Sequence, residues 1–180
     1  MSKFSGGTAK GSRENVIDAR KGRFMVLQDV EDVIGGYSGR SRTVLEYSVV
    51  IKRLVDEAKK PGFSVEGWAP LTDLVAVDEF ERVGPFKEVM NWDEYVTFLA
   101  NWAASSEWDC SFRRVTEVSD LVFLELEEHN KLGDFSNVVN SLSVYEFNNS
   151  GKIRHIALYL QMELPQGDML KSIEKVKNSG

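Results

Sequence analysis

Three stretches in the second half of the chain alternate apolar and polar residues, which is typical of strands with one buried face. The segments between them, residues 132–137 and 148–151, are rich in Gly, Asn, Asp and Ser, which tolerate the backbone angles of tight turns. The pattern therefore predicts adjacent antiparallel strands, and residues 110–118 favour a further strand ahead of them. The three predicted strands span residues 121–130, 138–147 and 153–162.

Apolar residues recur at helical spacing in the first half of the chain and again near its end. Thr43 and Glu46 have the spacing of a capping box, so the sequence predicts that a long helix begins there and ends near Ala58. Asn91 and Glu94 predict the start of another helix in the same way. The remaining predicted elements are a short helix over 24–34, a helix or turn pair over 65–74, and a small helix after Pro165.

Residues 75–83 alternate well enough to predict one more strand, which carries two carboxylates. Glu79 and Glu81 would share a face with Val77 and Val83, while Phe80 would point the other way. Either both carboxylates are solvated on an edge strand, or one of them faces a cavity. The order of elements predicts an α+β domain in which helices cover one face of a strongly bent, mostly antiparallel sheet.

Composition and charge indicate which partners and which cellular location to expect. The chain has 180 residues, 42% of them hydrophobic, and a net charge of −6, which argues against nucleic acid as a partner. Its one cysteine forms no internal disulfide, no signal peptide opens the chain, and no apolar run is long enough for a membrane span, so we expect a cytoplasmic protein. The expected organisation is a basic tail (1–23), a helical extension (24–42), one domain (43–165) and a C-terminal helix (166–180).

The residue types leave one main kind of chemistry. His129, His155 and Cys110 lack the spacing of a zinc site, and no GxSxG nucleophile elbow is present. Acid and base chemistry by side chains in an apolar cavity, with no metal and no cofactor, is what remains. His129 is a candidate proton shuttle, although both histidines fall opposite the apolar face of their strands. Glu128 and Asn130 share the inward face.

The run 142–153, followed by Tyr159-Leu-Gln161, resembles the closing hairpin of the nuclear transport factor 2-like (NTF2-like) superfamily, and within it the SnoaL-like polyketide cyclase and ketosteroid isomerase group. The resemblance covers about residues 43–165. It implies a cone-shaped α+β barrel around an apolar cavity, and a homodimer. This fold carries isomerases, dehydratases, hydrolases, lyases, cyclases and binding proteins, so it specifies structure better than activity.

Carried over by position, the resemblance implies roles for particular residues. Ser143 stands where the isomerases have a hydrogen-bond-donating aspartic acid, and Gln161 stands where many cyclase-like members have an aspartate. The base of the isomerases falls near Glu79 or Glu81, and the resemblance does not choose between them. The candidate catalytic residues are Glu81, Glu79, Tyr47, Ser143, Tyr145 and His129. The candidate substrate-binding residues are Trp68, Trp92, Tyr95, Asn130, Leu158 and Leu160.

Three hypotheses about function follow. The first is a SnoaL-like enzyme that isomerises, cyclises, dehydrates or cleaves a small, largely apolar or aromatic molecule by proton transfer. The second is a non-enzymatic module that binds a hydrophobic ligand or dimerises, and the third is a protein-interaction domain steered by the basic tail. The feature that separates the first two is whether a carboxylate or histidine projects into an apolar pocket.

Overall fold

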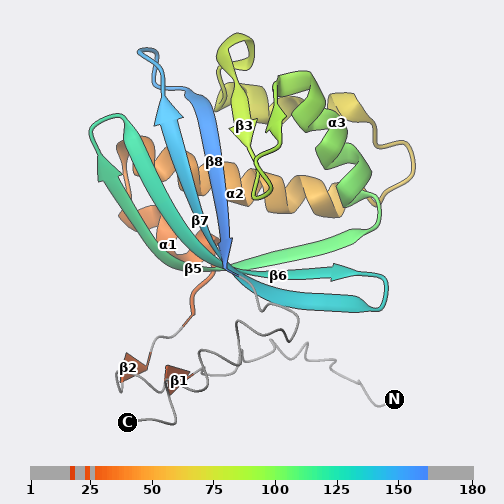
Figure 1. Cartoon of the computed structure of the whole chain (residues 1–180), viewed down its shortest axis with the longest axis horizontal. Helices are drawn as coiled ribbons and strands as arrows, with labels where there is room; N and C mark the ends of the chain where they lie inside the picture. The colour runs from red at the N-terminus through yellow and green to blue at the C-terminus, as the bar shows by residue number, and fades with distance from the viewer. Residues whose placement is uncertain (1–16, 19–22, 25–26, 162–180) are drawn as a thin grey trace, which may run out of the picture.

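A six-stranded sheet is the framework of the computed structural model (Figure 1). The structure describes residues 17–18, 23–24 and 27–161. The strand order is β4-β3-β8-β7-β6-β5, and only β3 and β8 run parallel to one another. The strands of this sheet are β3 (Glu81–Val83), β4 (Val89–Met90), β5 (Ser106–Val118), β6 (Leu121–Leu132), β7 (Phe135–Phe147) and β8 (Ile153–Gln161). A separate pair joins β1 (Ile17–Asp18) to β2 (Arg23–Phe24).

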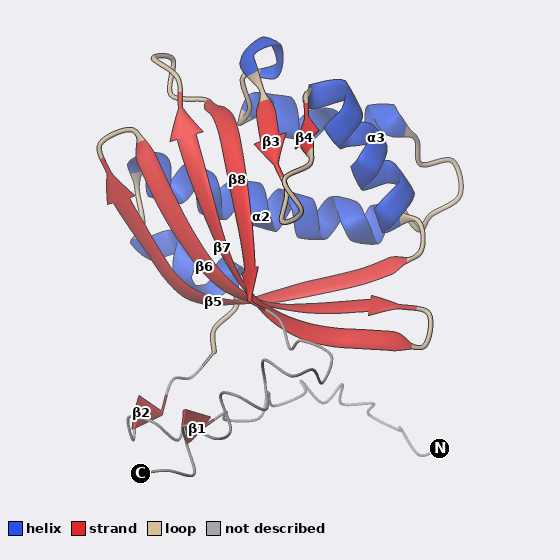
Figure 2. Cartoon of the chain, in the orientation of Figure 1, coloured by secondary structure: helices blue, strands red, loops and turns tan. Residues whose placement is uncertain are grey.

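The helices lie on one side of the sheet, and α2 runs along its concave face (Figure 2). In chain order the described helices are α1 (Val30–Val33), η1 (Ile34–Gly36), α2 (Gly39–Glu57), η2 (Val65–Asp73), η3 (Val77–Glu79) and α3 (Trp92–Ala103). A glutamate on β5, Glu117, accepts hydrogen bonds from the amide and hydroxyl of Ser41 in the first turn of α2, both at 2.9 Å. This contact fixes the start of α2 against the sheet and satisfies an amide that has no partner within the helix. No helix among the described residues is long and apolar enough to cross a membrane.

The long strands bend sharply, and a register shift in β5 contributes to the curvature. The pairing of β5 with β6 shifts between Phe112 and Arg114, which leaves Arg113 as an extra residue on β5. Such a bulge bends its strand and increases the local twist. Figure 1 shows the result, because β5, β6 and β7 curve around the helices. The concave side therefore becomes a hollow that side chains line.

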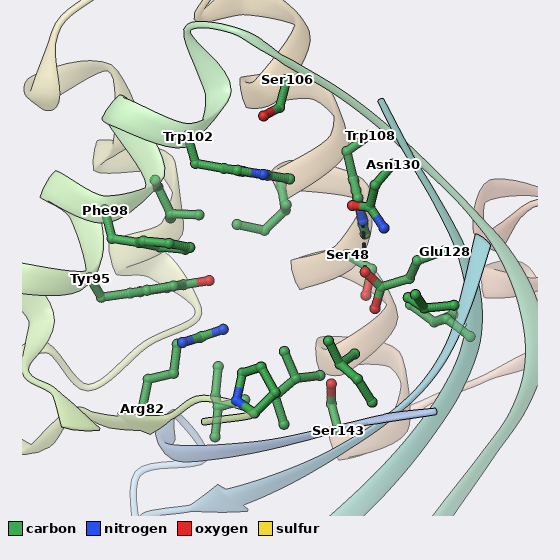
Figure 3. Close-up of a pocket in the computed structure, with 18 of the residues that line it drawn as sticks. Ser48, Arg82, Tyr95, Phe98, Trp102, Ser106, Trp108, Glu128, Asn130 and Ser143 are labelled. Atoms are coloured by element: carbon green, nitrogen blue, oxygen red, sulfur yellow. Dashed lines mark hydrogen bonds between the residues drawn. The ribbon is translucent and has the colours of Figure 1, made fainter. Parts of the chain in front are cut away.

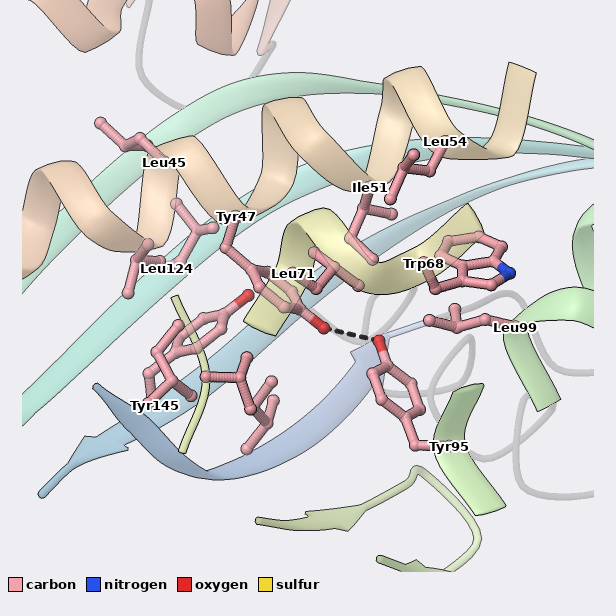
Figure 4. Close-up of a cluster of buried hydrophobic side chains, with 14 of the residues drawn as sticks. Leu45, Tyr47, Ile51, Leu54, Trp68, Leu71, Tyr95, Leu99, Leu124 and Tyr145 are labelled. Carbon is pink, nitrogen blue, oxygen red and sulfur yellow. Dashed lines mark hydrogen bonds between the residues drawn. The ribbon is translucent and has the colours of Figure 1, made fainter. Parts of the chain in front are cut away.

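The core lies between α2, η2, α3 and the concave face of the sheet (Figure 4). Alternate residues of β6 supply part of it, with Val122 and Leu124 fully buried. Val44, Ile51 and Val55 of α2 are also buried, at the spacing that one helix face requires. The core thus joins the two halves of the sequence.

The structure confirms the main predicted elements. β6, β7 and β8 are the three strands that alternation predicted, antiparallel and adjacent. The capping box of α3 is present, since the Asn91 side chain accepts from the Glu94 amide and the Glu94 carboxylate accepts from the Asn91 amide, both at 3.0 Å. The α+β class and the bent, mostly antiparallel sheet are likewise confirmed.

Several boundaries were wrong. The capping box at Thr43 does not form, because α2 begins four residues earlier and the Thr43 hydroxyl instead donates to the Gly39 carbonyl inside the helix. The helix predicted over 24–34 is reduced to α1 and η1. The turn predicted over 132–137 shrinks to two residues, which a positive φ of 59° at Gly133 permits. The predicted basic tail falls largely outside the described residues, and the C-terminal helix lies wholly outside them.

Candidate functional site

A cavity of 490 Å³ opens between the concave face of the sheet, α2, α3 and the β3–β4 hairpin (Figure 3). That volume lies within the range of small-molecule sites in proteins, about 300 to 1,000 Å³. Much of its wall is apolar, and a few polar groups converge on it. The apolar wall includes Ile51, Leu99, Trp102, Leu126, Val139, Ile156, Leu158 and Leu160, and the polar side chains include Tyr47, Ser48, Arg82, Tyr95, Glu128, Asn130, Ser143 and Tyr145.

A pair of tyrosine hydroxyls meets at one side of the cavity (Figure 4). Tyr47 projects from α2 and Tyr95 from α3, and their oxygens are 2.6 Å apart. A phenolic hydroxyl carries one proton, so only one of the two donates within the pair. The proton of the other hydroxyl remains available to a ligand. The geometry therefore supplies one hydrogen-bond donor inside an apolar hollow.

Burial raises the pKa of these hydroxyls. The pKa of Tyr47 lies well above its ordinary value, first because of burial and then because of the neighbouring Tyr95 and Tyr145. Burial also raises the pKa of Tyr95 and Tyr145, and the negative charge of Glu128 contributes to both shifts. The positive charge of Arg82 acts in the opposite direction on Tyr47 and Tyr95. All three tyrosines are neutral hydrogen-bond donors near pH 7.

Glu128 brings a carboxylate into the cavity from β6, across from Tyr95 (Figure 3). Its Oε2 accepts a hydrogen bond of 2.9 Å from the indole nitrogen of Trp108, which stands on the neighbouring strand β5. This bond orients the carboxylate through Oε2 and does not involve its second oxygen, Oε1. Glu128 is half-buried beside the buried thiol of Cys110, whose pKa is raised to about 12 mainly by burial and secondly by the charge of Glu128.

Arg82 projects into the cavity from β3 and is 8% exposed. Its guanidinium carbon lies 5.3 Å from the ring centre of Tyr95 and 5.4 Å from that of Phe98. Nη1 is 3.6 Å from a carboxylate oxygen of Glu88, which is an ion pair too long for a hydrogen bond. The two aromatic rings hold the guanidinium at the cavity wall by cation–π attraction.

The raised tyrosine pKa values predict how the protein responds to alkali. An unfolded tyrosine ionises near pH 10, so above about pH 10 the unfolded chain releases protons that buried Tyr47, Tyr95 and Tyr145 retain. Because the unfolded state then binds fewer protons, the free energy of unfolding falls as pH rises above 10. We expect an ultraviolet titration to show three of the five tyrosines ionising late, together with unfolding.

Tyr145→Phe is the matched control for this titration. It is expected to remove one late-ionising group and to reduce the loss of stability at high pH. Five tyrosines that ionise together near pH 10 in the folded protein would contradict the burial of the three hydroxyls.

Seven of the twelve residues predicted from the sequence line this cavity. They come from α2, α3 and three strands, so the fold brings together positions up to 113 residues apart, from Tyr47 to Leu160. Their catalytic or binding roles stay predictions. The seven are Tyr47, Tyr95, Asn130, Ser143, Tyr145, Leu158 and Leu160.

The expectation that Glu79 or Glu81 faces the cavity is wrong. The predicted strand over 75–83 exists only from Glu81, because residues 77–79 form a turn of 3₁₀-helix, and Glu79 accepts a hydrogen bond of 3.1 Å from Asn148 outside the cavity. In β3 the alternation places Glu81 outward, 3.2 Å from Nδ1 of His155. Arg82, which pairs with Ile156 of the cavity wall, points inward instead.

Three other predicted residues lie away from the cavity. His129 is on the outer face of β6, 3.4 Å from Glu127, where it lines a separate groove of 1350 Å³. Trp68 and Trp92 line a smaller hollow of 310 Å³ between η2 and α3. His129 follows Glu128 directly, and successive residues of a strand point to opposite faces, so His129 lies on the face of β6 opposite to Glu128. Among the described residues, no three His, Cys, Asp or Glu side chains group as a metal site would require.

Sequence reasoning missed Arg82 and ranked Glu128 behind other carboxylates. A signal for Arg82 was present in Phe80, which is 5% exposed and precedes it by two residues. Taking the face of Phe80 as the buried one would have placed Arg82 inward. Three further aromatic residues, Phe98, Trp102 and Trp108, also line the cavity. The sequence does not distinguish aromatic residues that face the cavity from those that pack in the core.

Comparisons with known proteins place the chain by its fold. No family model matches the sequence, and no curated protein matches it. Among solved structures, an NTF2-like protein of unknown function from Burkholderia pseudomallei K96243 is similar, with a TM-score of 0.53 and 14% identity over 69% of this chain and 92% of that one. RV0760c from Mycobacterium tuberculosis has a TM-score of 0.52 and 17% identity over 71% of this chain and 99% of that one.

A putative SnoaL-like polyketide cyclase from Jannaschia sp. CCS1 has a lower TM-score of 0.48, with 12% identity over 64% of this chain and 85% of that one. The likeness to the two structures with TM-scores of 0.52 and 0.53 establishes the fold, and identities of 17% and 14% leave activity open. The chain has an NTF2-like fold, as the resemblance of residues 43–165 implied.

Proposed function

We propose that this protein, with its NTF2-like fold, is an enzyme that transfers a proton on a small, largely apolar carbonyl compound held in the cavity. The observation that carries the proposal is the carboxylate of Glu128, which faces neutral tyrosine hydroxyls across an apolar hollow; the other carboxylate of the lining, Glu88, is beside Arg82. A base on one side and hydrogen-bond donors on the other are the groups that proton abstraction beside a carbonyl requires.

The proposed roles follow from the positions of the groups. Glu128 takes a proton from the carbon next to the carbonyl, and the C–H electron pair moves to form an enolate. The Tyr47–Tyr95 pair donates a hydrogen bond to the enolate oxygen, and Arg82 adds positive charge on the same side of the cavity. Return of the proton to the same or another carbon completes an exchange or an isomerisation. Trp108 is a positioning residue, because it holds Oε2 of Glu128.

The apolar wall selects the substrate by size and polarity. Trp102, Leu126 and Leu158 line the same cavity as the base and the donors. They favour an aliphatic or aromatic body, and the cavity volume of 490 Å³ admits a molecule of one or two rings. Homodimerisation and a cytoplasmic location remain predictions from the sequence.

A second candidate is a carrier that binds a hydrophobic molecule without changing it. It is favoured by two exposed aromatic residues at the cavity mouth, Phe86 and Phe135, which are 84% and 64% exposed. Exposed apolar groups around a hollow are common at ligand-binding surfaces. A carrier needs the cavity and needs no base.

Deuterium exchange separates the two candidates. Aryl ketones such as 2-tetralone and 3-benzoylpropanoate, incubated with the protein in D₂O, are expected to gain deuterium next to the carbonyl faster than in buffer alone. Proton NMR measures the loss of the C–H signal, and calorimetry measures binding in the same samples. Binding of the ketones with no acceleration of exchange would favour the carrier and contradict the enzyme.

A further inference from the structure

The cavity contains one feature that an apolar ketone does not explain, the buried guanidinium of Arg82. Its Nη1 is buried and has no hydrogen-bond partner. Figure 3 shows the guanidinium directed into the cavity beside the hydroxyl of Tyr95. An arginine is charged at every ordinary pH, so this wall of the cavity carries a permanent positive charge with an N–H donor to spare.

Glu88 does not neutralise this donor completely. The 3.6 Å separation from Nη1 exceeds hydrogen-bonding distance, and the Glu88 side chain is 34% exposed. Its other oxygen, Oε2, accepts a hydrogen bond of 2.9 Å from the amide of Phe86, which ties the carboxylate to the β3–β4 turn. The β3–β4 turn thus holds the Glu88 carboxylate near Arg82 without a hydrogen bond between Oε1 of Glu88 and Nη1 of Arg82.

The surroundings of Arg82 suit a planar anion. Tyr95 and Phe98 hold the guanidinium from the α3 side, and Pro85 and Ile156 line the cavity nearby. Guanidinium groups bind carboxylates through paired, charge-assisted hydrogen bonds. The second cation of the lining, Lys131, is exposed and already bonded to Glu107 at 2.9 Å. Arg82 is therefore the cation that a ligand inside the cavity meets.

We infer that the ligand of this cavity carries a carboxylate, which Arg82 binds, and that its apolar body lies along the wall toward Glu128. The inference rests on the proposed function for the identity of the site, and it specifies the substrate class as an aryl or alkyl keto acid. Glu128 lies across the cavity from Arg82, so it repels a misoriented carboxylate and fixes which end of the ligand meets the base.

The test compares two ligands that differ only in the replacement of a carboxylate by a neutral amide. 3-Benzoylpropanoate and 3-benzoylpropanamide have the same body and the same ketone, and isothermal titration calorimetry at pH 7 gives Kd for each with the whole chain. We expect the carboxylate to bind on the order of 10- to 100-fold more tightly, which is the worth of a hydrogen bond between charged groups. The absence of any carboxylate preference, whether both ligands bind equally or neither binds, overturns the inference.

Variants assign the preference to Arg82. Arg82→Gln is expected to remove the preference for the carboxylate while leaving the affinity for the amide within a few-fold. Glu88→Gln is expected to tighten carboxylate binding, because it removes the competing anion. Lys131→Gln is the matched control, since it removes a cation at the same cavity and should leave the preference intact. If Arg82→Gln unfolds, which its thermal melt reveals, tighter carboxylate binding by Glu88→Gln together with an unchanged preference in Lys131→Gln still supports the inference, and the absence of tightening in Glu88→Gln overturns it.

The failure of this inference is distinguishable from that of the proposed function. Preference for the carboxylate without deuterium exchange supports the anion site and contradicts the enzyme. Exchange of both ligands with equal affinity supports the enzyme and contradicts the anion site.

Discussion

Glu128→Gln is expected to lower the rate of ketone deuterium exchange by a factor of about 10² to 10⁴, the usual contribution of a positioned general base. Glutamine keeps an oxygen that accepts from the Trp108 indole, so the side chain should stay in place. Its amide cannot take a proton at neutral pH. The measurement is the NMR exchange rate under saturating ketone, with Kd from calorimetry expected to change little.

Glu125→Gln is the matched control. Glu125 is on the same strand, three residues away, and lies on the outer face, where it is paired with Arg114. The control removes one carboxylate from β6 without touching the cavity, so its exchange rate should equal that of the parent protein. Equal rates in Glu128→Gln and the parent would remove Glu128 as the base, whatever the affinity of the ketone.

Trp68→Ala is expected to produce the largest loss of stability among single core substitutions, about 3 to 5 kcal/mol. Trp68 of η2 is completely buried and packs edge-on against Phe63, with ring centres 5.8 Å apart. Alanine leaves a cavity that the surrounding structure fills only in part. For a chain of this size, about 1 kcal/mol shifts the melting temperature by about 2 to 4 °C, so the expected shift is roughly 6 to 20 °C.

Trp68→Phe separates packing from hydrogen bonding. The indole nitrogen of Trp68 is buried without a partner, so phenylalanine loses volume but no hydrogen bond and should cost clearly less than alanine. Val65→Ala on the same helix is the control, because Val65 is 48% exposed and should change stability by no more than about 0.5 kcal/mol. If Trp68→Phe lowers the free energy of unfolding as much as Trp68→Ala does, the indole N–H makes a stabilising hydrogen bond, which would contradict this expectation.

Much of the sheet was predictable because its strands are long and half-buried. In β6 and β7, buried residues recur at every second position, as at Leu124 and Tyr145, and this alternation predicted both strands and their inward faces. The two-residue turn that sets their register is shorter than the predicted one. The cavity residues on these strands were predictable for the same reason. Ser143 and Tyr145 lie inward because their strand can bury only one face.

The short β3 was not predictable by the same reasoning. Three residues provide little alternation, so that Phe80 just before them is the main signal for the inward face, and the turn at 77–79 shifts the phase of everything before it. The pairing of β3 with β8 decides which residues of β3 face the cavity. The parallel register sets Arg82 beside Ile156 and thereby directs the guanidinium inward and Glu81 outward. The sequence predicted that β3 directs a carboxylate into the cavity, and in the structure β3 directs Arg82 into it.

By itself, the sequence determined the α+β class, the antiparallel order of β5 to β8 and the amphipathic faces of α2 and α3, because these depend on periodicity within a single segment. Only the tertiary structure decided which charged groups share the cavity. Arg82, Glu128 and the Tyr47–Tyr95 pair come from four separate elements, and their meeting depends on strand pairing, on the bend of the sheet and on where each helix packs. No pattern along the chain encodes those distances, since they arise between segments rather than within them.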